Sequence, residues 1–90
     1  MSDGRGRYGA VSVTTTATKI LSAKVSRSKG LVQALTCDVY VGFDSSVTTS
    51  NGVFVPSGSS WSDESPGCWS GDIYAICAAG TVDVRYQEVG

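Results

Sequence analysis

The sequence predicts an all-β fold: a compact antiparallel β-sandwich of jelly-roll or immunoglobulin-like type, with about seven or eight short strands and no significant helix. Three observations support this prediction. Threonine and valine, whose branched Cβ atoms favour strands, dominate the chain from residue 10 onward. Apolar and polar residues alternate with a period of two in several short runs. Turn sequences rich in glycine, serine, proline and asparagine separate these runs at close spacing.

A chain of 90 residues is expected to form one domain, here preceded by a short arm. Residues 1–9 are glycine-rich, basic and without periodicity, so they predict a flexible N-terminal arm. Residues 10–90 then form the sandwich. In its first strand Val11 and Val13 alternate with polar residues, and the next apolar residues predict a second strand.

The middle of the chain begins with a turn at residues 26–30 (SRSKG) and a strand at residues 31–36 (LVQALT). The following run, DVYVGF, places Val39, Val41 and Phe43 on one face, which we predict to be a core face. The sequence therefore predicts that all three side chains are buried.

Two turns and a loop are expected next. Asn51 and Gly52 predict a two-residue hairpin, because both residue types tolerate positive φ. Residues 56–59 (PSGS) predict a second turn, and the SWS that follows predicts a short strand. Residues 63–71 (DESPGCWSG) are expected to form a longer loop.

The last part of the chain predicts a closing pair of strands around a tight AGT turn. In DIYAICA, the side chains of Ile73, Ala75 and Cys77 share one face. The final run, VDVRYQEV, alternates polar residues with three apolar residues that share a face: Val82, Val84 and Tyr86.

Charge is distributed unevenly along the chain. Residues 1–30 carry a net charge of +5, whereas residues 31–90 carry a net charge of −6. Such asymmetry can indicate an arm that meets an acidic partner. Two other arrangements are consistent with it: the two parts neutralise each other within one molecule, or the basic part of one subunit meets the acidic part of the next.

The composition argues against catalysis, because the chain contains no histidine. This excludes the commonest general base and every Ser-His or Cys-His nucleophile arrangement. Asp63 and Glu64 are adjacent in a Ser/Gly-rich loop and predict a solvated face, and no residue near Cys68 would activate its thiol. Asp38, Asp44 and Asp72 could form a calcium site, but they lack the spacing of a calcium loop. We therefore expect no enzyme activity, no metal and no cofactor.

The three cysteines predict neither a disulfide framework nor a zinc site. Cys37 and Cys77 lie in apolar runs and are expected to be buried thiols, whereas Cys68 is expected to be exposed in its loop. The N-terminal sequence predicts no signal peptide, and no apolar run reaches the length of a membrane span. The chain is therefore expected to fold in a cytoplasm with reduced thiols.

Two groups of residues are candidates for contact with a partner. Arg5, Arg7 and Tyr8 form a basic-aromatic arm that suits docking onto a protein surface; with only two cations on an acidic body, it is not expected to bind nucleic acid. Trp61 and Trp69 flank the longer loop, where they either cap the core or contact a protein or a glycan. The second candidate surface comprises five residues of this loop region: Trp61, Asp63, Glu64, Cys68 and Trp69.

Four stretches carry a resemblance to small virion proteins of tailed bacteriophages. They are VSVTTTATKILSA, SKGLVQAL, DVYVGFDSSVTTSNGVFVPSGSS and GDIYAICAAGTVDVRYQEV, and together they span about residues 10–90. Ten residues fit the closing hairpin of that plan: Ile73, Tyr74, Ala75, Ile76, Ala78, Gly80, Thr81, Asp83, Val84 and Arg85. The chain departs from the plan in its longer, tryptophan-rich loop and in Cys37 and Cys77.

The resemblance implies a non-enzymatic bacteriophage virion structural protein, expected to be a capsid decoration (cement) protein that binds and stabilises the assembled shell. It implies a major capsid protein or another virion protein as partner, a homo-oligomer with a trimer favoured, and a location in the virion after assembly in the host cytoplasm. No membrane is expected to be involved. The alternative is a tail, neck or head-fibre adhesion module that binds a host-surface glycan through Trp61 and Trp69.

Overall fold

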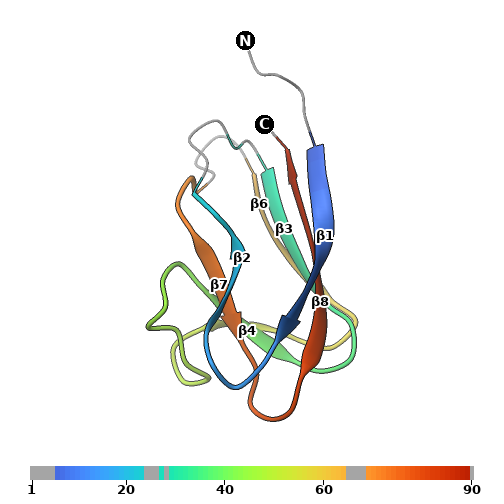
Figure 1. The fold of residues 1–90 in the computed structure, drawn as a ribbon, viewed down its shortest axis with the longest axis vertical. Coiled ribbons are helices and arrows are strands. Elements are labelled where there is room, and N and C mark those ends of the chain that lie inside the picture. The colour runs from blue at the N-terminus through green and yellow to red at the C-terminus, as the bar shows by residue number, and fades with distance from the viewer. Residues whose placement is uncertain (1–5, 24–26, 28, 65–68, 90) are drawn as a thin grey trace.

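The computed structural model describes residues 6–23, 27, 29–64 and 69–89, and over these residues it contains eight β-strands and no helix (Figure 1). The strands are β1 (Gly6–Val13), β2 (Thr18–Leu21), β3 (Lys29–Ala34), β4 (Val39–Gly42), β5 (Val53–Val55), β6 (Ser60–Glu64), β7 (Ile73–Ile76) and β8 (Val82–Val89). They form two four-stranded antiparallel sheets. The predicted all-β antiparallel sandwich is confirmed. Among the residues described, no helix is long and apolar enough to span a membrane.

The strand order is that of a jelly roll. One sheet has the order β1-β8-β3-β6 and the other β2-β7-β4-β5. Four of the ladders pair β1 with β8, β2 with β7, β3 with β6 and β4 with β5. This is the pairing that results when one long antiparallel hairpin is rolled up into a sandwich. In an immunoglobulin-like sandwich the first two strands are neighbours in one sheet, whereas here β1 and β2 lie in different sheets.

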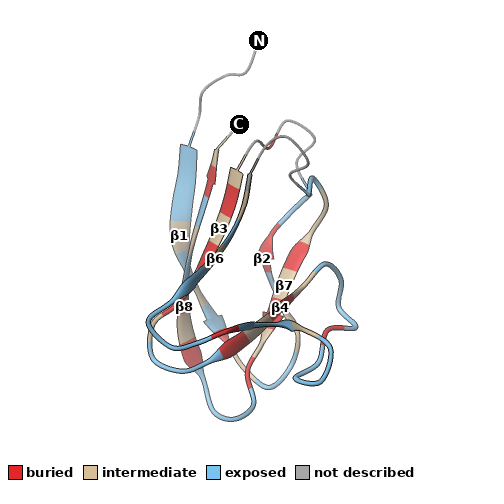
Figure 2. Cartoon of the chain, turned by 180° about the vertical axis from the view of Figure 1, so that it is seen from behind, coloured by how far each residue is buried: buried red, intermediate tan, exposed pale blue. Residues whose placement is uncertain are grey.

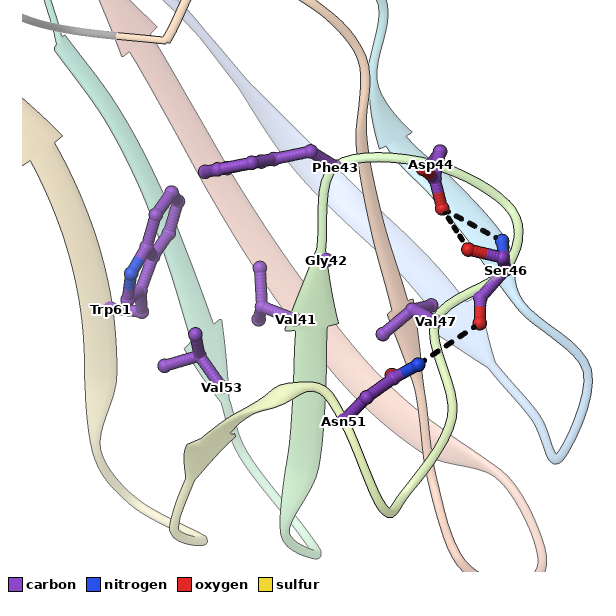
Figure 3. Close-up of a pocket in the computed structure, with 9 residues that line it drawn as sticks. All are labelled: Val41, Gly42, Phe43, Asp44, Ser46, Val47, Asn51, Val53 and Trp61. Atoms are coloured by element: carbon purple, nitrogen blue, oxygen red, sulfur yellow. Dashed lines mark hydrogen bonds between the residues drawn. The ribbon is translucent and has the colours of Figure 1, made fainter.

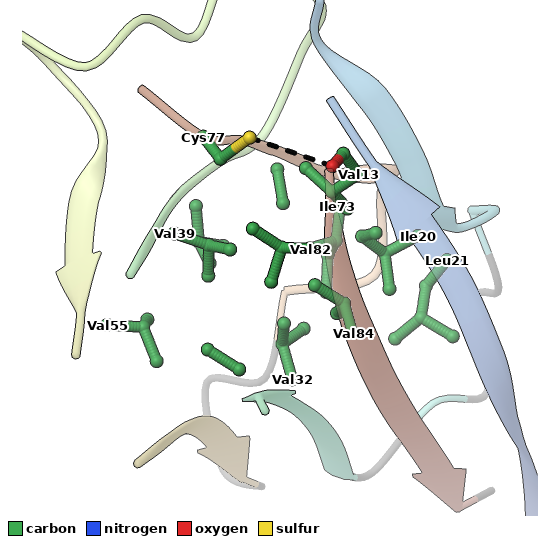
Figure 4. Packing of buried hydrophobic residues seen from close by; sticks show 13 residues of the cluster. Val13, Ile20, Leu21, Val32, Val39, Val55, Ile73, Cys77, Val82 and Val84 are labelled. Carbon is green, nitrogen blue, oxygen red and sulfur yellow. Dashed lines mark hydrogen bonds between the residues drawn. The ribbon is translucent and has the colours of Figure 1, made fainter. Parts of the chain in front are cut away.

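The core lies between the sheets and consists mainly of small branched side chains (Figure 4). Buried positions alternate with partly exposed ones along β3 and β7, as expected for strands with one covered face (Figure 2). Within the part of the chain that the structure describes, the buried cluster contains thirteen residues: Val13, Ile20, Leu21, Val32, Ala34, Val39, Val41, Val55, Ile73, Ala75, Cys77, Val82 and Val84. Of the residues predicted to share a face, Ile73, Ala75 and Cys77 of DIYAICA and Val82 and Val84 of VDVRYQEV are buried in this cluster, whereas Tyr86 is partly buried and packs against it.

The prediction of a flexible arm over residues 1–9 is wrong for residues 6–9. Strand β1 begins at Gly6 and pairs with β8 from Gly6↔Val89 to Val13↔Val82. Gly9 lies against the Tyr86 ring across this ladder: a Cβ there would lie 2.7 Å from the hydroxyl oxygen of Tyr86, so any larger residue would displace the ring. Residues 1–5, including Arg5, lie outside the described residues.

The prediction for residues 26–30 also needs correction, because the turn ends earlier than expected. Lys29 and Gly30 belong to β3 and pair with both β6 and β8. Gly30 is buried, with Leu21 and Ile73 within van der Waals distance of where its Cβ would be. The core therefore extends into a segment whose sequence looks like a turn.

The two-residue hairpin predicted at Asn51-Gly52 is wrong. Strand β4 ends at Gly42 and β5 begins at Val53, so ten residues connect them. Neither Asn51 nor Gly52 has positive φ. Gly52 is needed for close packing instead, because a Cβ there would lie 2.7 Å from the Cβ of Tyr40.

Two other turns agree with their sequences. In the predicted turn at residues 56–59, the Ser59 amide donates to the Pro56 carbonyl at 2.9 Å, and Gly58 has φ of 83°. A positive φ at the third residue is the requirement of a type II turn. Gly80, with φ of 71°, serves the AGT turn before β8.

The cysteine predictions have mixed outcomes. Cys77 is 2% exposed and packs in the core, as predicted. Cys37 is exposed, so its predicted burial is wrong: β3 ends at Ala34, and Cys37 lies in the bend before β4. Cys68 lies outside the described residues.

Candidate functional site

The structure separates the two described members of the predicted contact arm. Their side chains leave β1 in opposite directions because successive residues of a strand point to opposite faces. Tyr8 is 86% exposed on the outer face of its sheet. Arg7 turns toward Glu88, its partner in the register, with its Nε and Nη2 atoms 2.8 and 2.7 Å from Oε2. Arg7 is therefore engaged within the domain by its contact with Glu88, and Tyr8 remains the contact candidate.

Glu88 and Arg27 form a buried ion pair that the sequence reasoning missed. Both side chains are fully buried, and Arg27 Nε donates to Glu88 Oε1 at 2.9 Å. Arg27 Nη1 also donates to the carbonyl oxygens of Trp69 and Gly71, each at 2.9 Å, and Nη2 donates to the carbonyl of Ser22. Over the described residues, no buried side-chain nitrogen or oxygen is left without a partner. This cluster joins β8 to the segments that follow β2 and precede β7.

The position of Glu88 in its strand could have identified it. It shares strand parity with Val82 and Val84, whose side chains are fully buried. Burial acts to raise the pKa of Glu88, but hydrogen bonds from Arg27 and Arg7 and their positive charges outweigh it, so the pKa lies below its usual value. The carboxylate is therefore held ionised inside the protein.

The ion pairs also bear on the uneven charge along the chain. Arg7 and Arg27 both bind Glu88, and Lys19 lies 3.5 Å from Asp72. Each of these pairs joins the basic first third of the chain to the acidic remainder. The arrangement in which the two parts neutralise each other within one molecule is thus realised at these residues.

A second feature is an aromatic cluster formed by Phe43, Trp61 and Trp69. The prediction that Phe43 lies in the core with Val39 and Val41 is wrong, because β4 ends at Gly42 and Phe43 is 46% exposed. Its ring stacks on Trp69 with centroids 4.6 Å apart and 21° between planes. The Phe43 ring also contacts the Trp61 ring, with centroids 6.2 Å apart and an angle of 58° between the ring planes.

Trp69 is fixed in this cluster by its polar atoms. Its backbone N–H donates to Asp63 Oδ2 and its indole Nε1 donates to the Asp72 carbonyl, both at 2.8 Å. The indole also lies against Gly71, where a Cβ would come within 2.5 Å of it. Trp69 therefore braces Phe43, and Asp63 positions Trp69. The side chain of Glu64 lies outside what the structure describes.

Trp61 and Phe43 line a groove beside the core (Figure 3). Trp61 lies on β6 and packs against the buried cluster, and Val41 and Val53 form the floor between the two rings. The opposite side of the groove is polar and comes from the connection between β4 and β5. Asp44, Ser46 and Asn51 lie here, beyond Gly42 and Val47 as seen from the rings, and the Asp44 and Asn51 side chains point toward Ser46, to which both are hydrogen-bonded.

The outer face of the β1-β8-β3-β6 sheet is a third candidate surface. Tyr8 and Leu31 both pair with Gln87, so the three residues form a row across three strands. A shallow depression lies beside this row, lined by Ala10, Gln33 and Arg85 among others. Arg85 is held by the Asp83 carboxylate at 3.0 Å, and this hydrogen bond lowers the pKa of Asp83. The face thus carries little uncompensated charge.

The three aspartates considered for calcium do not come together. Asp38 accepts a hydrogen bond from the Ser57 amide, Asp44 from Ser46, and Asp72 from the Ala23 amide. Within the described residues, no group of three or more carboxylates and thiols is arranged to hold a metal ion. Asp44 thus stabilises a local turn, whereas Asp38 and Asp72 each join segments that are distant in the sequence.

Comparison with protein-family models, with curated proteins and with solved structures finds no match for the chain. The fold class therefore rests on the strand order and register described above, and the functional argument rests on the residues themselves.

Proposed function

We propose that the chain is a non-enzymatic structural protein of a tailed-phage virion, and specifically a capsid decoration (cement) protein that binds and stabilises the assembled shell. The sequence resemblance over residues 10–90 supports this proposal. The jelly-roll sandwich is compatible with it, because capsid domains use that architecture, although the same fold serves unrelated functions.

The observation that carries the proposal is the exposure of Tyr8. The Tyr8 ring is 86% exposed on the outer face of its sheet, so nearly all of it is available for contact with a partner. Tyrosine combines a rigid apolar ring with a polar tip and is enriched at protein interfaces. Arg85 beside it is paired with Asp83, so an interface here would bury a matched ion pair and would leave no unpaired charge at these two residues.

The proposed partner is the major capsid protein or another virion protein, and the chain would act as a homo-oligomer, with a trimer as the expected form. Several copies of a modest interface on one assembly reinforce each other, because each contact holds the others near their sites. Attachment of many copies would then resist pressure from the packaged genome. The chain would fold in the host cytoplasm and end in the virion.

The test is attachment of purified protein to empty shells of the phage that encodes it, followed by co-sedimentation. Tyr8→Ala is expected to weaken attachment at least about tenfold, as for an interface hot spot. Phe54→Ala is the matched control, since Phe54 is 53% exposed on the outer face of the other sheet. Unchanged attachment of the Tyr8→Ala protein, or failure of the unmodified protein to sediment with shells, would contradict the proposal.

Deletion of residues 1–9 is unsuitable as a test, because it would also remove Gly6–Gly9 of β1 and the Arg7 contact with Glu88. Deletion of residues 1–5 leaves β1 whole. This shorter deletion measures the contribution of Arg5 to attachment, and circular dichroism and urea unfolding should match the full chain.

A second candidate function is adhesion to a host-surface glycan as a tail, neck or head-fibre module. The specific observation in its favour is the groove between Phe43 and Trp61, with a polar wall opposite the rings. The two candidate functions are compatible, because the groove and the Tyr8 face lie on different parts of the molecule.

A further inference from the structure

The groove opens where the edges of the two sheets meet. Strand β6 is the edge of one sheet and β5 is the edge of the other. Trp61 of β6 faces Val53 of β5 across this opening, with Phe43 above them (Figure 3). Val53 is 52% exposed and Phe43 46% exposed, so apolar surface of the kind normally buried in a sandwich remains open to solvent.

The rings that line the groove are held in place before any ligand arrives. Phe43 is backed by Trp69 in a nearly parallel stack, and Trp69 is fixed through hydrogen bonds at both its backbone and its indole nitrogen. Trp61 is anchored by its contact with the core. The 58° tilt between Phe43 and Trp61 produces an aromatic corner with fixed walls.

The polar wall is also preorganised. Asp44 Oδ1 accepts hydrogen bonds from the amide and the hydroxyl of Ser46, and Asn51 Oδ1 accepts from the Thr48 amide at 2.7 Å. Val47 is 6% exposed and anchors the connection in the space that Gly42 and Gly52 leave open. A wall held by such contacts loses little conformational entropy on binding.

Charge and hydrogen-bonding capacity together define the class of ligand. The groove presents carboxylate, amide and hydroxyl groups on one side and aromatic faces on the other. The lining residues that the structure describes include one carboxylate and no lysine or arginine, so at these residues an anionic ligand would meet repulsion without compensation. The hydrogen bonds from Ser46 lower the pKa of Asp44, and the group is therefore a carboxylate at neutral pH.

We propose that this groove binds a neutral pyranose unit of a glycan, with the C–H face of the sugar against Phe43 and Trp61 and its hydroxyls on Asp44 and Asn51. A pyranose matches both walls, because one of its faces is apolar while its edge carries hydroxyls that donate to a carboxylate and accept from an amide. This inference deepens the adhesion function and does not rest on shell attachment. It also changes the role expected of Trp69, which supports the Phe43 ring from behind and does not itself contact the sugar.

The test uses the full chain and follows 1H–15N resonances and tryptophan fluorescence during titration. The probes are methyl glycosides of glucose, galactose and mannose, with N-acetylneuraminic acid as the anionic comparison. Concentrations up to about 100 mM detect a millimolar Kd. At least one neutral glycoside should shift the resonances of Phe43, Asn51 and the Trp61 indole, while the anionic sugar should not. Absence of any shift with the neutral sugars, or equal binding of the anionic one, would overturn the inference.

Two variants test whether the ligand binds in the groove. Phe43→Ala should weaken binding at least about tenfold, equivalent to about 1.4 kcal/mol, whereas the similarly exposed Phe54→Ala control should bind as the unmodified chain does. Asp44→Asn keeps an oxygen acceptor for Ser46 and removes the charge, so it should weaken binding of the neutral sugar and reduce discrimination against the anionic one. Equal binding by the Phe43 and Phe54 variants would exclude the aromatic corner as the site.

The outcomes for the two functions are separable. A chain that sediments with shells but binds no glycoside refutes the glycan site alone. A chain that binds a neutral glycoside but does not sediment with shells refutes the decoration function alone. The Phe43→Ala variant should still attach to shells, since Phe43 is remote from the outer face that contains Tyr8.

Discussion

Removal of the Glu88 carboxylate is the sharpest test of how this small sandwich is held together. Its side chain is fully buried, and it accepts hydrogen bonds from Arg27 at 2.9 Å and from Arg7 at 2.8 Å. In Glu88→Ala the guanidinium of Arg27 would remain buried without its counter-charge. The remaining partners of Arg27 are carbonyl oxygens, which satisfy hydrogen bonds but do not neutralise its charge.

The expected magnitude follows from burial. Removing one member of a buried ion pair typically costs about 3–5 kcal/mol, because the other charge is left uncompensated. The Arg7 contact adds less, since its side chain is 60% exposed and surface pairs contribute up to about 1 kcal/mol. A domain of this size has a total unfolding free energy of roughly 5–13 kcal/mol. Glu88→Ala should therefore remove a large fraction of the stability, and Arg7→Ala only a small one.

The assay is urea unfolding followed by circular dichroism at neutral pH, with a double-mutant cycle of Glu88→Leu and Arg27→Met. The double variant should be more stable than either single variant, because it removes both charges and leaves an apolar contact. Since the Arg27→Met change also frees three carbonyl groups, Glu88→Gln provides an independent comparison that preserves shape. A loss below about 1 kcal/mol for Glu88→Ala, or additive effects in the cycle, would refute the reasoning.

Two further predictions concern pH and thiol reactivity. Because the folded pKa of Glu88 lies below its usual value of about 4.5, its contribution to stability is present above that value and is lost as the pH falls through the folded pKa. Urea midpoints between pH 6 and pH 2 should therefore fall more steeply for the unmodified chain than for Glu88→Gln, and equal slopes would contradict this. In a Cys68→Ser background, a thiol reagent should label Cys37 in the native protein and Cys77 only after unfolding; two fast-reacting thiols would show that Cys77 is not protected.

Local sequence patterns predicted most of the strands because the information they need is local. The period of two identified which residues share a face in β7 and β8, and Gly58 and Gly80 stand in turns whose φ values suit glycine. The Asn51-Gly52 prediction failed because packing overrode a local preference. The chain between β4 and β5 is folded around Val47, and glycine at residue 52 is required by the nearby Tyr40.

The candidate sites were only partly predictable. Tyr8, Trp61 and Trp69 were identified from their residue types and neighbours, but their roles were not. Arg7 and Tyr8 are adjacent in β1, so their side chains lie on opposite faces of the sheet. The Tyr8 side chain is exposed, whereas the Arg7 side chain contacts Glu88. Phe43 was assigned to the core because it continues the alternation of β4, yet the strand ends one residue earlier.

Local residue patterns were sufficient to show that this protein is all-β, where most strands lie and which face of several strands is apolar. These properties depend on residues within a few positions of each other. Only the tertiary structure decided the jelly-roll pairing, the burial of Glu88 with Arg27, and the meeting of Phe43 with Trp61 and Trp69. The physical reason is that these contacts join residues distant in the chain, such as Arg7 and Glu88, which are 81 positions apart. Their formation depends on the register of whole strands, which no local pattern specifies.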